Sequence, residues 1–289
     1  MLPDFVCVGT YKAATTWLFQ VLDEHPGVFV PDVKEVHFFN RRGGMDAFVD
    51  KGPAWYSSLY APSAPGAVLG DITPGYLACP DSAGRIAGLM PNARILLLLR
   101  DPIARLHSHY WYRAGMSAQV PSLDAVIDDW SEHLDDLVWQ GMYATHLARF
   151  REHFPAEQIK VCFMEDLKAD PPGSYASICE FIGVDSGFVP PSLTRSANTA
   201  RAFRSKRLYR LNRLVARTLY LNGGDRVRRV IKRSGLPRLL DRFNRQAVKN
   251  PALSGSQRAR LRSIYGPEIQ RLEGMLDRDL SGWKHEVVA

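Results

Sequence analysis

The fold is decided by the stretch Phe5–Phe39, which reads FVCVGTYKAATTWLFQVLDEHPGVFVPDVKEVHFF. It opens with the apolar run Phe5–Val8, whose length and β-branched character are typical of a buried strand. A turn over Gly9–Lys12 follows, and from Thr15 onward apolar residues recur at helical spacing. A strand, a tight loop and a helix start offer an anion converging N–H donors and the positive end of the helix dipole. The stretch therefore predicts a phosphate-binding loop.

This loop does not fit the Walker A pattern, Gly-x4-Gly-Lys-Ser/Thr. Gly9 and Thr16 have the required spacing, but Ala14 replaces the second glycine and Thr15 replaces the lysine. The one lysine of the loop, Lys12, lies ahead of the helix instead. We expect the two threonine hydroxyls to cap the helix start. These departures argue against a nucleoside triphosphatase. Two interpretations of the segment remain open: an anion-binding site, and an ordinary strand, turn and helix with an incidental surface lysine.

Length and composition favour one large α/β domain, or one and a half. The 289 residues are 46% hydrophobic, which is enough for one substantial core. Residues 1–4 lead directly into the first strand, so we expect no signal peptide, and no apolar run approaches the roughly 18 residues of a membrane-spanning helix. The four scattered cysteines lack metal-ligand spacing and indicate buried thiols of a reducing compartment. We therefore expect a cytoplasmic protein without a zinc or disulfide framework.

A second informative segment is Val33–Phe39. If it is extended, alternation places Glu35 and His37 on one side and Val36 and Phe38 on the other. Two titratable groups would then project together. From this pattern alone, a solvated strand edge with ordinary charges is the simpler interpretation.

The most hydrophobic run of the chain, Ala93–Leu99, predicts a central parallel strand that is covered on both faces. Arg100 follows this strand, and a helix is expected from Ile103 onward. In open α/β sheets, ligands bind where the carboxyl end of a strand meets a helix start. Arg100 can bind a phosphate with two N–H groups, and Ser108 offers a hydroxyl two turns further on.

Three motifs together resemble the sulfotransferases that use 3′-phosphoadenosine 5′-phosphosulfate (PAPS). Gly9–Leu18 resembles their 5′-phosphosulfate loop, Lys-x-Gly-Thr-Thr, in which the lysine also precedes the hydroxyl pair. Lys34–Phe39 has the Lys-Glu-x-His-Phe-Phe signature of the glycan-type and many bacterial members. Leu99–Tyr110 matches the 3′-phosphate motif, Leu-Arg-Asp-Pro-x-x-Arg-x-x-Ser-x-Tyr. The resemblance implies an α/β three-layer sandwich with a central, mostly parallel sheet and a P-loop-like phosphosulfate-binding loop.

The resemblance also implies the ligands and the residue roles. The donor would be PAPS, the product adenosine 3′,5′-bisphosphate, and no metal would take part. The residues that it assigns to donor binding are Lys12, Ala13, Ala14, Thr15, Thr16, Trp17, Arg100 and Ser108. The catalytic residues would be Lys12, Glu35 and His37, with Glu35 as the base that deprotonates the acceptor hydroxyl and His37 holding the substrate or assisting. Arg201 and Arg204 are further candidates, in a basic loop that closes over the donor phosphates.

Two positions depart from the family pattern. Ala14 stands where glycine is usual, so a left-handed backbone there is harder to adopt. Ile72 stands where many relatives carry a second active-site lysine. The segment around Ile72 therefore leaves Asp71, Thr73 and Tyr76 as candidate site residues.

Residues 201–249 form a strongly basic segment, with 16 Lys and Arg against two aspartates. Because the whole chain carries a net charge of +7, the remainder is acidic. Three interpretations of this segment remain open: a solvated helical subdomain, a loop that closes over the donor, and a surface that binds an anionic acceptor or a lipid headgroup. Nucleic acid is disfavoured because no base-reading motif accompanies the charge. We expect a single sulfotransferase domain over residues 1–289 with a basic helical insertion at about 201–249.

The acceptor is expected to be a hydroxyl of a carbohydrate, a lipid or a natural product, and the oligomeric state is not predicted. Two other functions remain open. One is an ATP-dependent kinase with a P-loop-like site. The other is a non-catalytic module that binds a nucleotide or a membrane surface through the basic segment.

Overall fold

The computed structural model describes residues 1–42, 44–61, 63–117, 119–133, 136–194, 201–203, 245–247 and 250–284. Contacts divide the chain into two compact units. The first comprises Met1–His107, Leu123–Ala197 and Leu253–Ala289, and the second Ser108–Ser122 and Asn198–Ala252. Most of the predicted basic insertion lies outside the described residues, so its helical character stays a prediction.

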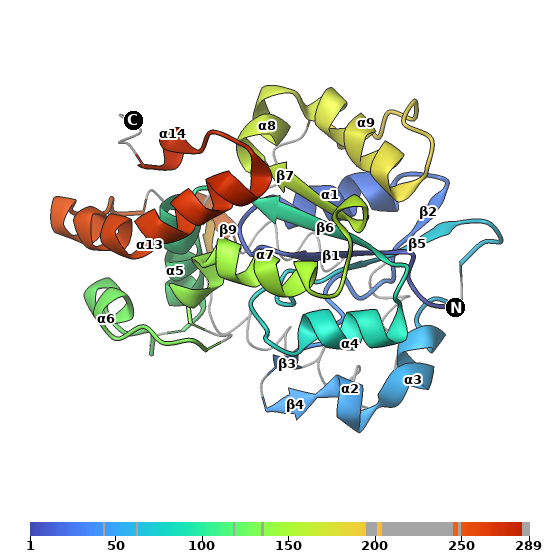
Figure 1. Ribbon diagram of the computed structural model, residues 1–289, viewed down its shortest axis with the longest axis horizontal. Coiled ribbons are helices and arrows are strands. Elements are labelled where there is room, and N and C mark those ends of the chain that lie inside the picture. The colour runs from blue at the N-terminus through green and yellow to red at the C-terminus, as the bar shows by residue number, and fades with distance from the viewer. Residues whose placement is uncertain are drawn as a thin grey trace. The chain divides into compact units, whose positions relative to one another are not determined.

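The first unit is built on a five-stranded sheet in the order β2-β5-β1-β6-β7 (Figure 1). Its strands are β1 (Phe5–Gly9), β2 (Val28–Phe29), β5 (Val68–Ile72), β6 (Arg94–Leu99) and β7 (Ile159–Phe163). Every pairing in this sheet is parallel. The central strand β1 lies between β5 and β6, with Phe5 in register with Gly70 on one side and Arg94 on the other. The predicted mostly parallel sheet is confirmed.

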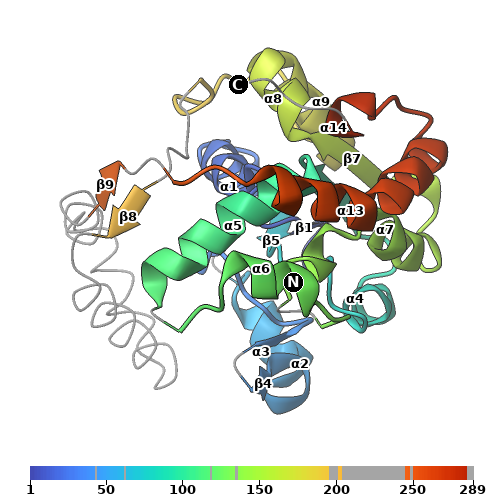
Figure 2. The same ribbon diagram turned by 90° about the vertical axis from the view of Figure 1, so that its left-hand side faces the viewer.

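Helices cover both faces of this sheet (Figure 1). One face is covered by α1 (Thr15–Asp23), α8 (Met164–Ala169) and α9 (Pro171–Ile182), whose apolar side chains share a buried core with those of β1 and β6. On the other face lie α4 (Ser82–Leu89) and α7 (Tyr143–Arg151). Figure 2 shows α13 (Gly255–Leu276) running beside α7 and α6 (Leu123–Asp128). The predicted three-layer architecture is confirmed.

The remaining elements are short, apart from one helix. They are the hairpin β3 (Arg41–Arg42) and β4 (Met45–Asp46), the helices α2 (Ala47–Asp50), α3 (Gly52–Ser58), α5 (Pro102–Met116) and α14 (Ser281–Lys284), and the 3-10 turns η1 (Trp139–Gly141) and η2 (Ala156–Gln158). In the second unit, β8 (Arg201–Phe203) pairs antiparallel with β9 (Arg245–Ala247). Val33–Phe39 forms no strand, so the condition under which its side chains would alternate regularly is not met.

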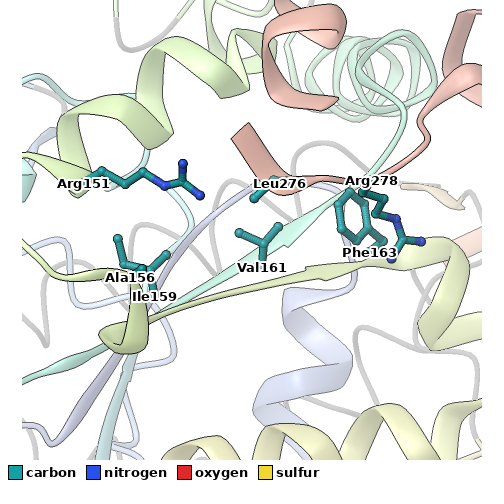
Figure 3. A pocket seen from close by; sticks show the side chains of 7 residues that line it. All are labelled: Arg151, Ala156, Ile159, Val161, Phe163, Leu276 and Arg278. Carbon is teal, nitrogen blue, oxygen red and sulfur yellow. The ribbon is translucent and has the colours of Figure 1, made fainter. Parts of the chain in front are cut away.

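The C-terminal segment packs against the edge strand β7. Arg278 donates two hydrogen bonds, of 2.8 and 2.7 Å, to the carboxylate of Asp166 and lies 3.9 Å over the ring of Phe163. At the other end of the pocket shown in Figure 3, Arg151 donates to the carbonyl of Met275 at 2.8 Å. Arg151 therefore fastens the end of α13 to α7, and Arg278 fastens the segment after α13 to α8 and β7.

The end of β1 depends on a glycine. A Cβ atom at Gly9 would lie 2.6 Å from the Cβ of Leu77, which is closer than real Cβ contacts allow. The clash involves the stem of a buried side chain that cannot rotate away. Gly9 therefore permits the close approach of the segment after β5 to the start of the phosphate-binding loop.

We expect Gly9→Ala to lower the free energy of unfolding by about 1–3 kcal/mol, because overpacking a buried contact has a cost of this size. Gly88→Ala is the matched control, since nothing lies within 4 Å of a Cβ at this exposed position of α4. It should be neutral or stabilising by up to about 1 kcal/mol. Urea denaturation of both variants measures the difference, and equal stabilities would contradict this account of Gly9.

Candidate functional site

The loop that the sequence predicts to bind phosphate joins β1 to α1. Lys12 and Ala14 in this loop adopt left-handed backbone conformations, with φ angles of 69° and 65°. The residue before α1 is Ala14, and no side chain caps this helix within the part of the chain that the structure describes. The expected capping by Thr15 and Thr16 is therefore wrong. Turns of this kind and an uncapped helix start both present backbone N–H groups to an anion.

Ala14 holds a conformation that glycine adopts more easily. For an L-residue with a Cβ atom, the left-handed region costs roughly 1–2 kcal/mol. The structure therefore supports the concern that alanine is strained here, while showing that the loop accommodates it. Ala13 and Trp17 contribute side chains to the core, and the Trp17 indole donates to the carbonyl of Leu193 at 2.9 Å. If these two residues contact a ligand, their backbone N–H groups must do so.

Arg100 lies beside this loop, as the sequence predicts. It follows β6, and its guanidinium donates to the carbonyl of Lys12 at 3.3 Å across 88 residues of sequence. Burial lowers the pKa of Arg100 from its usual value, since a charged group is harder to keep in an apolar surrounding. The two family motifs around Lys12 and Arg100 thus meet at the carboxyl ends of neighbouring strands, where open α/β sheets bind ligands.

Three other predicted donor residues belong to the second unit. Ser108 lies on α5, two turns after its first residue. Arg201 starts β8, of which only the backbone is described, and Arg204 lies outside the described residues. Their roles stay predictions.

Glu35 and His37 face each other, although the segment that carries them is irregular. His37 has a left-handed φ angle of 53°, and its Nε2 lies 3.3 Å from Oε2 of Glu35. The other ring nitrogen, Nδ1, lies 3.1 Å from Oδ1 of Asn40. Because the amide nitrogen of Asn40 donates to the carbonyl of Gly75 at 3.3 Å, the amide oxygen is the atom that faces His37. Both ring nitrogens of His37 thus face oxygen acceptors, Oδ1 of Asn40 and the carboxylate of Glu35, and a neutral imidazole can donate its one N–H to only one of them at a time.

The imidazole of His37 is kept neutral near pH 7. Burial, together with the nearby charge of Arg42, lowers the pKa of His37 from 6.5 to about 4, and the Glu35 carboxylate offsets only part of this effect. The side chain of Glu35 is 25% exposed, whereas that of His37 is 9% exposed, so the Glu35 carboxylate is the more accessible of the two groups to an acceptor hydroxyl.

Two cations adjoin the carboxylate of Glu35. The ammonium of Lys34 lies 3.3 Å from Oε1, and a guanidinium nitrogen of Arg42 lies 3.5 Å from Oε2. The same ammonium donates to the hydroxyl of Thr16 in the first turn of α1 at 3.1 Å. Lys34 thus joins the phosphate-binding helix to the carboxylate, and the side chain of Glu35 remains a quarter exposed.

A buried carboxylate holds this segment in place. Asp71, at 0% exposure, accepts hydrogen bonds from the hydroxyls of Thr73 at 2.6 Å and Tyr76 at 2.9 Å. These hydroxyls in turn accept the backbone N–H groups of Val36 at 3.0 Å and Phe38 at 2.9 Å. Since Val36 and Phe38 flank His37, the network sets the backbone from which Glu35 and His37 project. Asp71 also accepts a hydrogen bond from Tyr56 at 2.9 Å.

Sequence reasoning missed Lys34, Asn40 and Arg42 as site residues. Lys34 and Asn40 adjoin the Glu-x-His-Phe-Phe segment, so proximity in sequence was a usable signal. Asp71, Thr73 and Tyr76 were found, but they support the segment from behind. Ile72 is buried in the core at 1% exposure and presents no polar group to the site.

No group of three or more potential metal-ligand side chains occurs among the described residues. Over the same residues, none of the helices combines the length and the apolar character that crossing a membrane would need.

The Asp71 network makes a testable prediction about stability. Burial raises the pKa of Asp71 from 3.8 to about 6, outweighing the hydroxyl donors. The folded state then binds the proton of Asp71 more tightly than the unfolded state does. The contribution of Asp71 to the free energy of unfolding therefore falls by on the order of 3 kcal/mol as the pH rises from about 4 to about 6. Relative to Asp71→Asn, the unmodified protein should therefore lose stability across this window. Urea denaturation at pH 4, 5, 6 and 7 measures the difference, and a difference that is constant or grows with pH contradicts it.

Comparisons with known proteins agree with this geometry. The family model described as "Sulfotransferase domain" matches residues 2–213. Human heparan sulfate glucosamine 3-O-sulfotransferase 3B1 is 29% identical over 188 residues, which cover 63% of this chain and 46% of that protein. The membrane-associated sulfotransferase kil1 of Dictyostelium discoideum is 33% identical over 114 residues, covering 38% and 23% of the two chains. The chain thus spans about half the length of the human relative.

A solved structure supports the fold. The crystal structure of a sulfotransferase from Alicyclobacillus acidocaldarius matches with a TM-score of 0.68 and 23% identity, covering 99% of this chain and 100% of that one. The predicted fold class is confirmed by this likeness and by the sheet itself. Since the family model matches most of the chain, including the loop at Lys12, the carboxylate of Glu35 and the guanidinium of Arg100, the chain belongs to the sulfotransferase domain family.

Proposed function

We propose that this protein transfers the sulfuryl group of PAPS to a hydroxyl of a carbohydrate acceptor. The observation that carries the proposal is the position of Glu35. Its carboxylate contacts Lys34, which also binds the first turn of α1, and it faces a neutral imidazole on its other side. A proton acceptor thus adjoins a site built for an anion, which is the arrangement that transfer from a phosphosulfate to a hydroxyl needs.

The donor residues fit a ligand with two phosphate positions. The left-handed turns at Lys12 and Ala14 and the start of α1 supply N–H groups for the 5′ side. Arg100, anchored on the carbonyl of Lys12, supplies a guanidinium for the 3′-phosphate, with Ser108 as its predicted companion. When bound, PAPS supplies an activated sulfuryl group. Lys12 and the N–H groups of α1 then stabilise the negative charge that gathers on the leaving phosphate.

Glu35 and His37 divide the proton chemistry between them. As the acceptor oxygen bonds to sulfur, the bond between sulfur and the phosphate oxygen breaks, its electron pair stays with the phosphate, and the hydroxyl proton passes to Glu35. The carboxyl group that results can donate to Nε2 of His37 when the imidazole carries its proton on Nδ1, toward Oδ1 of Asn40. His37 then receives a hydrogen bond from Glu35 while its own ring stays neutral.

The names of the relatives support the acceptor class. Heparan sulfate glucosamine 3-O-sulfotransferases 3B1 and 3A1 are both 29% identical to this chain over 188 residues. Their names describe transfer to a sugar hydroxyl. A lipid or natural-product hydroxyl remains the alternative acceptor from the sequence analysis, and mass spectrometry of candidate acceptors incubated with PAPS distinguishes these classes.

The ATP-dependent kinase is the less favoured alternative. The loop lacks the second glycine and the lysine of the Walker A pattern, and Ala14 and Thr15 occupy those positions. The second alternative, a non-catalytic module, does not explain why the Glu35 carboxylate lies in contact with a neutral histidine and a lysine.

Donor choice gives a direct test. Adenosine 3′,5′-bisphosphate at a concentration about 100 times its Kd should stabilise the protein by about 2.7 kcal/mol, whereas ATP at the same concentration should have little effect. Arg100→Ala should abolish most of this stabilisation, because it removes the proposed 3′-phosphate ligand. Thermal unfolding with each nucleotide provides the measurement. Stabilisation by ATP alone would favour the kinase instead.

The base assignment gives a second test. We expect Glu35→Gln to reduce kcat by about 10²–10⁴-fold, the usual contribution of general base catalysis, with little change in nucleotide affinity. Glu180→Gln is the control, since Glu180 is exposed on α9. Steady-state sulfation of an oligosaccharide containing glucosamine, with circular dichroism to verify folding, provides the measurement. Near-normal turnover in Glu35→Gln would contradict this assignment and would indicate that His37 is the base.

A further inference from the structure

Lys34 occupies a position that the proposed function has not yet used. Its ammonium donates to Oγ1 of Thr16 at 3.1 Å and to Oε1 of Glu35 at 3.3 Å. Thr16 belongs to the first turn of α1, on the donor side, and Glu35 is the proposed base, on the acceptor side. The Lys34 side chain is 29% exposed, so the ammonium is neither buried in the core nor fully solvated.

The transferring group must pass between these two sides. In a loose transfer transition state, the leaving oxygen, the transferred group and the acceptor oxygen lie roughly in line. A cation that touches both the first turn of α1 and the base therefore lies beside the path of the transferred group. An ammonium has three N–H donors, and the two contacts with Thr16 and Glu35 account for two of them.

The end of β5 supplies no cation to this carboxylate. Ile72 there is 1% exposed and packs in the core with side chains of β1 and α1. Lys34, by contrast, places its ammonium 3.3 Å from Oε1 of Glu35.

We propose that Lys34 is a catalytic residue that binds an oxygen of the sulfuryl group of the donor while it keeps the Glu35 carboxylate directed at the acceptor. This inference rests on the proposed function. In the transfer, the bond from sulfur to the 5′-phosphate oxygen breaks and that oxygen keeps the electron pair. The acceptor oxygen forms the new bond to sulfur, and its proton passes to Glu35. Lys34 forms and breaks no covalent bond, and its positive charge stabilises the sulfuryl oxygens throughout.

The test compares two nucleotides that differ only in the sulfuryl group. Isothermal titration calorimetry, without acceptor, measures the Kd of PAPS and of adenosine 3′,5′-bisphosphate for the unmodified protein and for Lys34→Met. A charge-assisted hydrogen bond to the sulfuryl group predicts that PAPS affinity falls by at least about tenfold more than bisphosphate affinity. Lys34→Arg should recover part of the loss, since it restores a cation.

Lys160→Met provides the matched control, because this lysine lies on β7 over the ring of Phe181. It should leave both affinities unchanged, and thermal unfolding verifies that every variant is folded. An unchanged ratio of the PAPS and bisphosphate affinities in Lys34→Met would overturn the inference. Lys34 would then have only a structural role, as a hydrogen-bonded contact between α1 and Glu35. Failure of the unmodified protein to bind either nucleotide would instead overturn the proposed function, and this inference with it.

Discussion

The buried carboxylate of Asp71 is the constraint on which the acceptor side of this site depends. It lies at the end of β5 without exposure to solvent, and two hydroxyls link it to the backbone on either side of His37. A segment without regular hydrogen bonding needs such external partners, because it cannot satisfy its own N–H groups. The sheet thus fixes an irregular segment through side chains rather than through strand pairing. These hydrogen bonds to the backbone of Val36 and Phe38 therefore determine where the side chains of Glu35 and His37 lie.

Charged side chains join the proposed donor side of the site to the proposed acceptor side. On the donor side, Arg100 holds the carbonyl of Lys12, so the end of β6 and the loop after β1 form one unit. On the acceptor side, Glu35 adjoins Lys34, Arg42 and a neutral His37. The ammonium of Lys34 contacts both sides. Such preorganised charges need no rearrangement during the reaction, which is the main way in which a protein accelerates a transfer with little covalent chemistry of its own.

The sequence was sufficient for the fold and for the members of the site that belong to motifs. Apolar runs predicted β1 and β6. The resemblance assigned Lys12 and Arg100 to one ligand, and the structure places the guanidinium of Arg100 beside the carbonyl of Lys12. The failures share a physical cause. Capping by Thr15 and Thr16 was wrong because the left-handed turn at Ala14 places both threonines inside the helix. Regular alternation along Val33–Phe39 is interrupted at His37, whose φ is left-handed, and Thr73 and Tyr76 bind the backbone on either side of it. Such contacts between distant segments leave no periodic signal, so the contact of Lys34 with Thr16 and that of Asn40 with Gly75 could not be predicted from the sequence.

The central claim is that one anion site at the start of α1 and another at Arg100 hold the two ends of a single nucleotide. A crystal structure with adenosine 3′,5′-bisphosphate tests it most directly. The account predicts the 5′-phosphate on the N–H groups of the loop between Lys12 and Trp17, and the 3′-phosphate on the guanidinium of Arg100. A nucleotide bound with neither phosphate in contact with these groups would contradict it.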